Sequence, residues 1–138
     1  MKKQILLLIL AVLPLSSWAD DSGKCGENVT YYYDESTKIL KISGSGEMED
    51  YAFSGIAKNP PWIWKGYSKD IASVIIGDGI TSIGINAFHN CSSLTSVTIP
   101  EGVKSIEERV FCGCSSLTII NIPNSVTSIG SYAFKFCI

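Results

Sequence analysis

Apolar residues recur every 23 positions through the second half of the chain. Three copies follow one another, reading IASVIIGDGITSIGINAFHNCSS, LTSVTIPEGVKSIEERVFCGCSS and LTIINIPNSVTSIGSYAFKFCI. The positions that coincide are Ile71/Leu94/Leu117, Val74/Val97/Ile120, Ile76/Ile99/Ile122, Ile80/Val103/Val126, Ile83/Ile106/Ile129, Phe88/Phe111/Phe134 and Cys91/Cys114/Cys137. A period of roughly 20 to 50 residues is typical of solenoids, in which each copy is one coil and buries its apolar face against its neighbours.

Each copy predicts two short extended pieces and a compact end. Alternation in the first piece (SVIIG, SVTIP or IINIP) places Val97 and Ile99 inward, and Ser96 and Thr98 outward. The second piece covers, for example, residues 102–106, and we expect a helical turn in the compact NAFHNC or RVFCGC end. Equivalent strands of stacked coils would then form a parallel sheet, with strands about 4.8 Å apart.

Residues 20–70 have a different pattern. Val29–Asp34 and Ile39–Gly44 are rich in strand-forming residues and are joined by four polar residues, which predicts a β-hairpin. We interpret the region as a cap over the first coil, because an exposed solenoid end needs one. The predicted fold is therefore mainly β: a three-coil solenoid (71–93, 94–116 and 117–138) behind an N-terminal β-hairpin cap.

The first 19 residues predict a signal peptide, and so an exported protein. Lys2 and Lys3 precede an apolar stretch, and Ser17-Trp18-Ala19 offers small residues for cleavage. The apolar stretch is shorter than the about 20 residues that a membrane span needs. Without residues 1–19, 9 basic and 13 acidic residues remain. This mildly acidic balance, with no basic patch in the sequence, argues against nucleic acid as a partner.

Several segments match a known pattern: LTSVTIPEGVKSIEERVFCGCSS in the repeats and, before them, CGENVT (25–30), LKISGSGEMEDY, Pro60-Pro61-Trp62 and IASV (71–74). They resemble the bacterial surface-antigen type of leucine-rich repeat, often called BspA-like. The resemblance implies a right-handed leucine-rich repeat solenoid, export, and adhesion or ligand binding at the cell surface. It supplies no catalytic residues. The general pattern L-x-x-L-x-L-x-x-N/C-x-L is met only in its first half, so the common horseshoe type is a poor guide.

The expected function is an exported, non-catalytic binding module for a protein or glycan. No hydrolase elbow, phosphate-binding loop or zinc-protease helix is present in the sequence, and no cofactor is indicated. The outward strand positions are Ala72, Ser73, Ile75, Thr95, Ser96, Thr98, Thr118, Ile119 and Asn121. The candidate binding face consists of Ser73, Ile75, Thr95, Ser96, Thr98, Thr118 and Asn121. The alternative is that these residues form an ordinary solvated sheet face, and the chain could be a structural capping or spacer segment with no ligand of its own.

The last coil is expected to present an open apolar edge that favours self-association. The residues of this candidate association edge are Leu117, Ile120, Ile122, Val126, Ile129 and Phe134. Two interpretations are open: the chain is a piece of a longer array, which we favour, or this edge pairs with another chain.

The five cysteines cannot all pair within one chain, because their number is odd. Cys91, Cys114 and Cys137 recur in the apolar register, so we expect small buried groups. Cys112 lies outside that register and could be an exposed thiol, a partner of Cys25, or an incidental residue without a role.

Two further groups of side chains could carry chemistry. His89 lies one coil from Cys112, but no third or fourth metal ligand has suitable spacing, so no metal site is predicted. A group of aromatic residues could form a binding platform or pack the cap against the first coil; we favour packing, because Trp and Tyr are highly buried on average. This group comprises Tyr31, Tyr33, Tyr51, Trp62, Trp64 and Tyr67.

Overall fold

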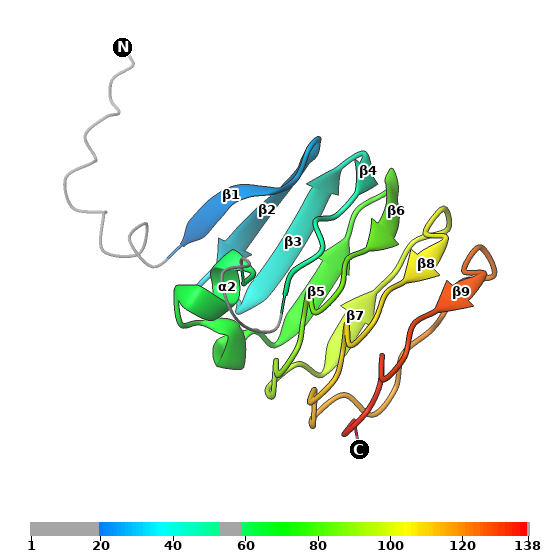
Figure 1. Ribbon diagram of the computed structural model, residues 1–138. Helices are drawn as coiled ribbons and strands as arrows, with labels where there is room; N and C mark the ends of the chain where they lie inside the picture. The colour runs from blue at the N-terminus through cyan, green and yellow to red at the C-terminus, as the bar shows by residue number, and fades with distance from the viewer. Residues whose placement is uncertain (1–19, 53–58, 138) are drawn as a thin grey trace, which may run out of the picture.

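The computed structural model describes residues 20–52 and 59–137, so the predicted signal peptide lies outside the described residues. One sheet contains β1 (Asp21–Gly26), β2 (Val29–Asp34), β3 (Ile39–Gly44), β5 (Ser73–Ile76) and β7 (Ser96–Thr98), in that order. A second sheet contains β4 (Gly46–Glu47), β6 (Ile80–Ile83), β8 (Ser105–Ile106) and β9 (Ser128–Ile129). Two short helices, α2 (Pro61–Trp64) and η2 (Ser68–Asp70), precede the repeats (Figure 1).

Parallel pairing follows the sequence period. Val74 on β5 pairs with Val97 on β7, and Ser82, Ser105 and Ser128 align on β6, β8 and β9. Because the register equals the 23-residue period, equivalent residues of successive coils lie directly beside one another. The prediction of a mainly β fold with parallel strands is confirmed.

The compact end of each coil is a turn and not the helical turn that we expected. Alternate N–H groups donate to the following coil: Phe88 N bonds to Val110 O at 3.0 Å, and Phe111 N to Ala133 O at 2.8 Å. Asn86, at the start of such a turn, has a φ of 60°, which no α-helix accepts. Donors that a helix would use internally therefore join one coil to the next.

The residues before the repeats form another layer of the same stack. Leu40 on β3 pairs with Val74 in parallel, and Gly46 on β4 pairs with Ile80. β3 and β4 thus occupy, one layer earlier, the places of β5 and β6. β3 also pairs antiparallel with β2 across residues 35–38, where the sequence predicts a hairpin. β1 was not predicted, because its sequence DSGKCG has low strand propensity.

The first extended piece of the third copy differs from the prediction. Residues 118–122 form no strand, although the equivalent residues of the first two copies form β5 and β7. Among the described residues, this segment would have a neighbouring strand on one side only, that of β7. It could therefore form one ladder of hydrogen bonds and not two.

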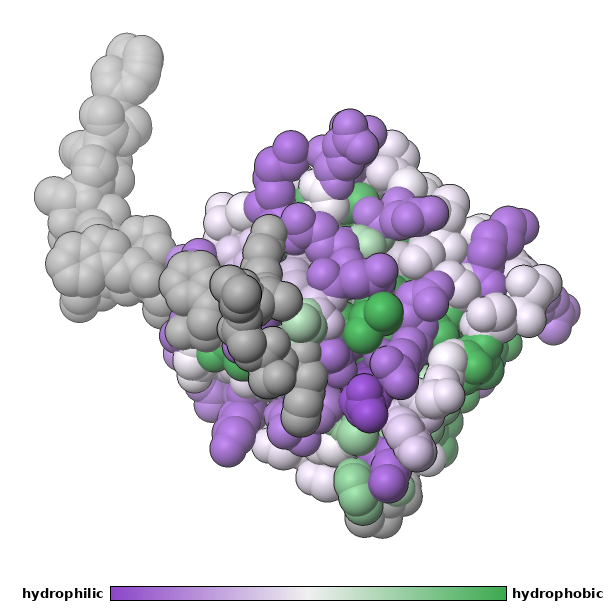
Figure 2. All heavy atoms as spheres, in the orientation of Figure 1, coloured by the Kyte–Doolittle hydropathy of each residue, from purple (hydrophilic) through white to green (hydrophobic). Residues whose placement is uncertain are grey.

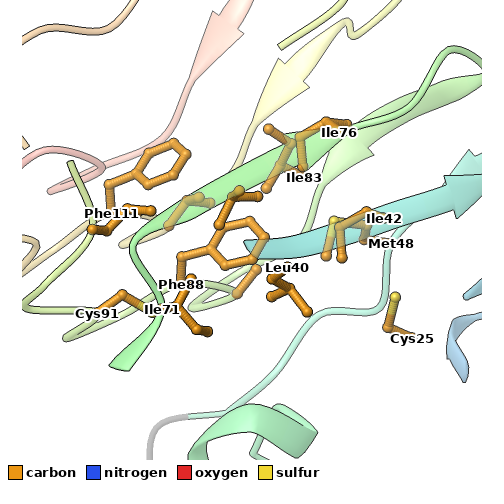
Figure 3. Close-up of a cluster of buried hydrophobic side chains, with 14 of the residues drawn as sticks. Cys25, Leu40, Ile42, Met48, Ile71, Ile76, Ile83, Phe88, Cys91 and Phe111 are labelled. Carbon is orange, nitrogen blue, oxygen red and sulfur yellow. The ribbon is translucent and has the colours of Figure 1, made fainter. Parts of the chain in front are cut away.

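A stack of aromatic rings runs through the interior of every layer. The ring centroids of Trp62 and Phe88 are 5.6 Å apart, those of Phe88 and Phe111 5.7 Å, and those of Phe111 and Phe134 5.6 Å. The rings of each pair are inclined by only 15–16°. Figure 3 shows Phe88 and Phe111 side by side in the apolar interior. Trp62 therefore takes the place of the repeat phenylalanine in the layer before the first copy.

The other aromatic residues of this region also pack inside. Tyr31, Tyr33 and Tyr51 are buried, and Tyr67 stacks on Tyr33 with 4.3 Å between the ring centroids. This confirms packing for the residues whose side chains are described, a set that does not include Trp64. Their rings offer no free platform for a ligand.

The cysteines are all unpaired. Cys91 and Cys114 are buried, as their register predicts, and the thiol of Cys114 donates to Phe88 O at 3.1 Å. Cys137 makes the equivalent bond to Phe111 O at 3.2 Å. The expectation that Cys112 is exposed or paired with Cys25 is wrong: it is a free thiol with 7% of its surface exposed. The equivalent residues are half-buried in the first copy, at His89, and exposed in the last, at Lys135, so Cys112 is the most covered of the three.

Substitutions of Trp62 test the aromatic stack. Nε1 of Trp62 donates to Ala87 O at 2.7 Å. Trp62→Phe should therefore lower the free energy of unfolding by about 1–3 kcal/mol through the lost hydrogen bond, and Trp62→Ala by about 3–5 kcal/mol through the cavity. Urea unfolding measures both. The control is Tyr32→Phe at an exposed ring, expected to cost less than about 1 kcal/mol. Equal costs at the two positions would contradict the assignment.

Candidate binding face

The outer face of the five-stranded sheet carries most of the predicted binding positions. Ser73 and Ile75 on β5 lie opposite Ser96 and Thr98 on β7. Ile75, Ser96 and Thr98 are exposed and Ser73 is half-buried, whereas the alternate residue Val74 is fully buried. The structure thus brings these four residues together in two short rows.

The other three predicted binding positions do not belong to these two rows. The hydroxyl of Thr95 donates to Ala72 O of the preceding coil at 3.2 Å, so it serves the stack and has less capacity for a ligand. Thr118 and Asn121 are exposed but lie in the segment that forms no strand. The ordered part of the face is therefore narrower on the C-terminal side than the sequence predicts.

On the N-terminal side the face extends further than predicted. Tyr32 on β2 pairs with Lys41 on β3, and Lys41 pairs with Ile75 on β5. All three side chains are exposed. The alternation in VTYYYD and ILKISG could have assigned Tyr32 and Lys41 to one face. The parallel pairing of β3 with β5, which joins that face to the repeats, has no signal in the local sequence.

The predicted association edge is only partly exposed. Ile122 and Ile129 have 36% and 50% of their surface exposed, and Figure 2 shows apolar surface at the edge where the last coil lies. Ile120, Val126 and Phe134 are partly buried against the core. Leu117 is only 3% exposed, so the expectation that it belongs to the open edge is wrong; as the first residue of its coil it packs back into the interior.

Burial shifts the pKa of two cysteines and of the histidine. Burial raises the pKa of the Cys25 thiol to about 12, with the charge of Glu49 adding to the effect, and burial likewise raises the pKa of Cys114 to about 12. The reactive form of cysteine is the thiolate, so neither residue is a nucleophile near neutral pH. Burial, followed by the charge of Arg109, lowers the pKa of His89. Within the described ranges, no cluster of His, Cys, Asp or Glu could hold a metal ion.

The repeats match a family model. The model for the BspA type leucine-rich repeat region (6 copies) matches residues 66–138, just over half of the chain. The chain belongs to this family. The resemblance read from the motifs is thereby confirmed, and the BspA-type match begins five residues before the first predicted copy, at the turn that contains η2.

Solved structures of bacterial leucine-rich repeat proteins are similar to this chain. A leucine-rich repeat protein from Eubacterium ventriosum is 30% identical over 85% of this chain and 30% of its own, with a TM-score of 0.73. One from Bacteroides ovatus is 25% identical over 81% and 32%, with a TM-score of 0.52. A leucine-rich cell surface protein from Faecalibacterium prausnitzii is 30% identical over 84% and 35%, with a TM-score of 0.50.

This chain thus spans about a third of the length of each of these proteins. No curated protein matches it. In the part of the chain that the structure describes, no helix has the length and apolar character to cross a membrane.

A polar cluster ties the first strand to the residues that lead into the BspA-type repeats. Oδ2 of Asp21 on β1 accepts hydrogen bonds from the hydroxyls of Tyr31 and Tyr67 at 2.8 and 2.5 Å. Its Oδ1 accepts one from Nζ of Lys65 at 2.6 Å. Burial raises the pKa of Asp21, but these hydrogen bonds and the Lys65 charge lower it by more, so the pKa lies below its ordinary value. The ionised carboxylate is therefore the form that the fold stabilises.

Acid titration of stability tests this cluster. Because the folded-state pKa of Asp21 is lowered, its contribution is complete above the unfolded pKa of about 3.9 and is lost as pH falls through the folded pKa. Asp21→Asn should lower the free energy of unfolding by about 1–2 kcal/mol at pH 7, and by much less near pH 2. Urea unfolding at both pH values measures the difference. Asp78→Asn, at an exposed turn residue, is the control; a pH-independent cost at position 21 would refute the interpretation.

Proposed function

We propose that this protein is an exported, non-catalytic binding module that contacts a protein or glycan partner at the cell surface, in an adhesive role. The observation that carries the proposal is the pair of in-register rows Ser73–Ser96 and Ile75–Thr98 on the outer face of a rigid sheet. Proteins of this fold generally use such repetitive surfaces for binding. Leucine-rich repeat proteins mediate protein interactions, and the family is one of bacterial repeat proteins without a characteristic catalytic site.

Two findings support the location at the cell surface. Residues 1–19 have the pattern of a signal peptide, and one of the similar solved proteins is described as a cell surface protein. We propose the division into a signal peptide (1–19), an N-terminal cap (20–70) and repeats (71–138). The cap assignment is supported by Trp62, which lies over Phe88 and accounts for one end of the aromatic stack.

The binding of the isolated module should be weak. Stable interfaces bury about 800 Å² on each partner, and the repeats alone provide a sheet that is only two ordered strands wide. A longer array with many copies would gain affinity by adding rows. This is consistent with the greater length of the similar solved proteins.

Substitutions on the outer face test the function. We expect Ser96→Gln combined with Thr98→Gln to reduce binding at least about tenfold, because longer side chains block the rows while the interior stays unchanged. Binding is measured on an array of purified glycans and extracellular proteins. Ser115→Gln, at an exposed turn residue, is the control, and unfolding midpoints verify that both variants fold. Binding that survives the face variant, or its absence from the whole array, would contradict the proposal.

The alternative is a structural capping or spacer segment of a larger surface assembly. It is favoured by the exposed apolar residues of the last coil, which include Ile122 and Ile129 of the predicted association edge. Exposed apolar surface of this kind marks a place where another layer or another chain can pack, and covering it would stabilise the assembly.

The mass of the protein in solution distinguishes the structural role from the binding role. Light scattering over a concentration series should show association that rises with concentration, and Ile129→Asp should abolish it, because a buried unpaired carboxylate is costly. Ile75→Asp, which introduces the same change on the outer face of the sheet, is the control. A monomer at every concentration would count against the structural role and leave binding as the function.

A further inference from the structure

Two lysines lie on the outer face of the five-stranded sheet, beyond the repeats. Lys24 on β1 and Lys41 on β3 are exposed, and their strand partners place both on the outer side. Neither forms an ion pair with any described residue. The chain as a whole carries more acidic than basic residues, so this face differs in charge from the average surface.

The middle of this face holds no acidic residue. Its exposed outward positions from β1 to β7 are Ser22, Lys24, Thr30, Tyr32, Lys41, Ser43, Ile75, Ser96 and Thr98. Two carboxylates lie at the far end, near the β2–β3 turn, and both are engaged: Asp20 accepts from the Tyr32 hydroxyl at 2.8 Å, and Asp34 from Ser36 N at 2.9 Å. Both donors are neutral, so these carboxylates keep their charge; the negative charge of this face lies at that end, and the positive charge of Lys24 and Lys41 lies on the central rows.

One row crosses all five strands in register. Ser22, Tyr32, Lys41, Ile75 and Thr98 pair in sequence from β1 to β7. With strands about 4.8 Å apart, the row is about 19 Å long. It alternates hydrogen-bonding groups with an exposed aromatic ring and an aliphatic side chain, which suits an extended polymer with hydroxyl groups and apolar ring faces.

We infer that this row binds an anionic polysaccharide, a sugar chain that bears carboxylate or sulfate groups. The inference rests on the proposed function and names its ligand class. A protein partner is less suited, because interfaces between proteins need a cluster of apolar anchors at the centre. On the strands of this sheet only Tyr32 and Ile75 are exposed large apolar residues. Lys41, which lies between them, attracts the anionic groups while the ring and hydroxyls contact the sugar.

Because the chain is acidic overall, the inference predicts how binding depends on salt concentration. The average field of the protein repels a polyanion, so attraction must come from the local charges of Lys24 and Lys41. Exposed charges are screened within about 8 Å at physiological ionic strength. Binding should therefore weaken steeply as salt is added.

The experiment uses the purified chain on immobilised polygalacturonate and immobilised heparin, with dextran as the neutral polymer, at 50 and 300 mM salt. We expect binding to both anionic polymers and not to dextran, and weaker binding at the higher salt. Lys24→Gln combined with Lys41→Gln should reduce affinity about tenfold. The matched control is Lys69→Gln combined with Lys104→Gln, which removes the same charge from exposed positions outside this sheet. Tyr32→Ala should weaken binding without changing its salt dependence, and Tyr32→Phe should not.

Each outcome decides between the claims. Loss of binding in the Lys24/Lys41 variant, with the control unchanged, supports the inference. Equal loss in both lysine variants shows attraction by total charge alone and overturns it, as does equal binding to dextran or no binding to the anionic polymers. If a protein on the array described above binds through Ser96 and Thr98 and ignores the lysines, the proposed function stands and this inference fails.

Discussion

The stack of aromatic rings from Trp62 through Phe88 and Phe111 to Phe134 is the contact on which the other layers of this structure depend. Phe88 and Phe111 each stack on a ring of the layer before and on a ring of the layer after, so the burial of these two rings depends on the neighbouring coils. The ring spacing of 5.6–5.7 Å exceeds the about 4.8 Å between strands. The ring centroids are therefore offset from one another along the stack and do not lie directly face to face. Hydrogen bonds between successive turns, such as Phe88 N to Val110 O, hold the segments that carry the rings together.

The sequence predicts the interior of the repeats well and their surroundings poorly. The aligned residues Phe88, Phe111, Ile83 and Ile106 are all buried, because a period repeated three times averages out local ambiguity. Trp62 could not be placed in the same stack, since it precedes Phe88 by 26 positions and not 23. β1 could not be predicted either, because its glycines and polar residues form a strand only through pairing with β2.

For the candidate binding face, too, the sequence predicts some features correctly and misses others. Alternation assigned Ser96 and Thr98 to the outside correctly, since a strand has a period of two whatever its neighbours are. Which strand lies beside the first repeat is a long-range fact that local patterns do not contain. For that reason Tyr32 and Lys41 were assigned to a separate hairpin, although they continue the same surface. Cys112 illustrates a different limit: the variable residue type at this repeat position suggests exposure, yet burial differs from coil to coil, from exposed Lys135 to buried Cys112.

The equality of the strand register and the sequence period has a consequence for how such a protein changes over generations. Inserting or deleting one whole copy leaves every ladder in phase, because Ser82, Ser105 and Ser128 are equivalent places in successive coils. Losing a single residue inside a strand moves the following side chains of that strand to the opposite face. Recombination between misaligned copies of the gene is therefore tolerated where small deletions are not. Outward residues such as Ser96 and Thr98 do not pack in the core, so the same scaffold can carry different surfaces.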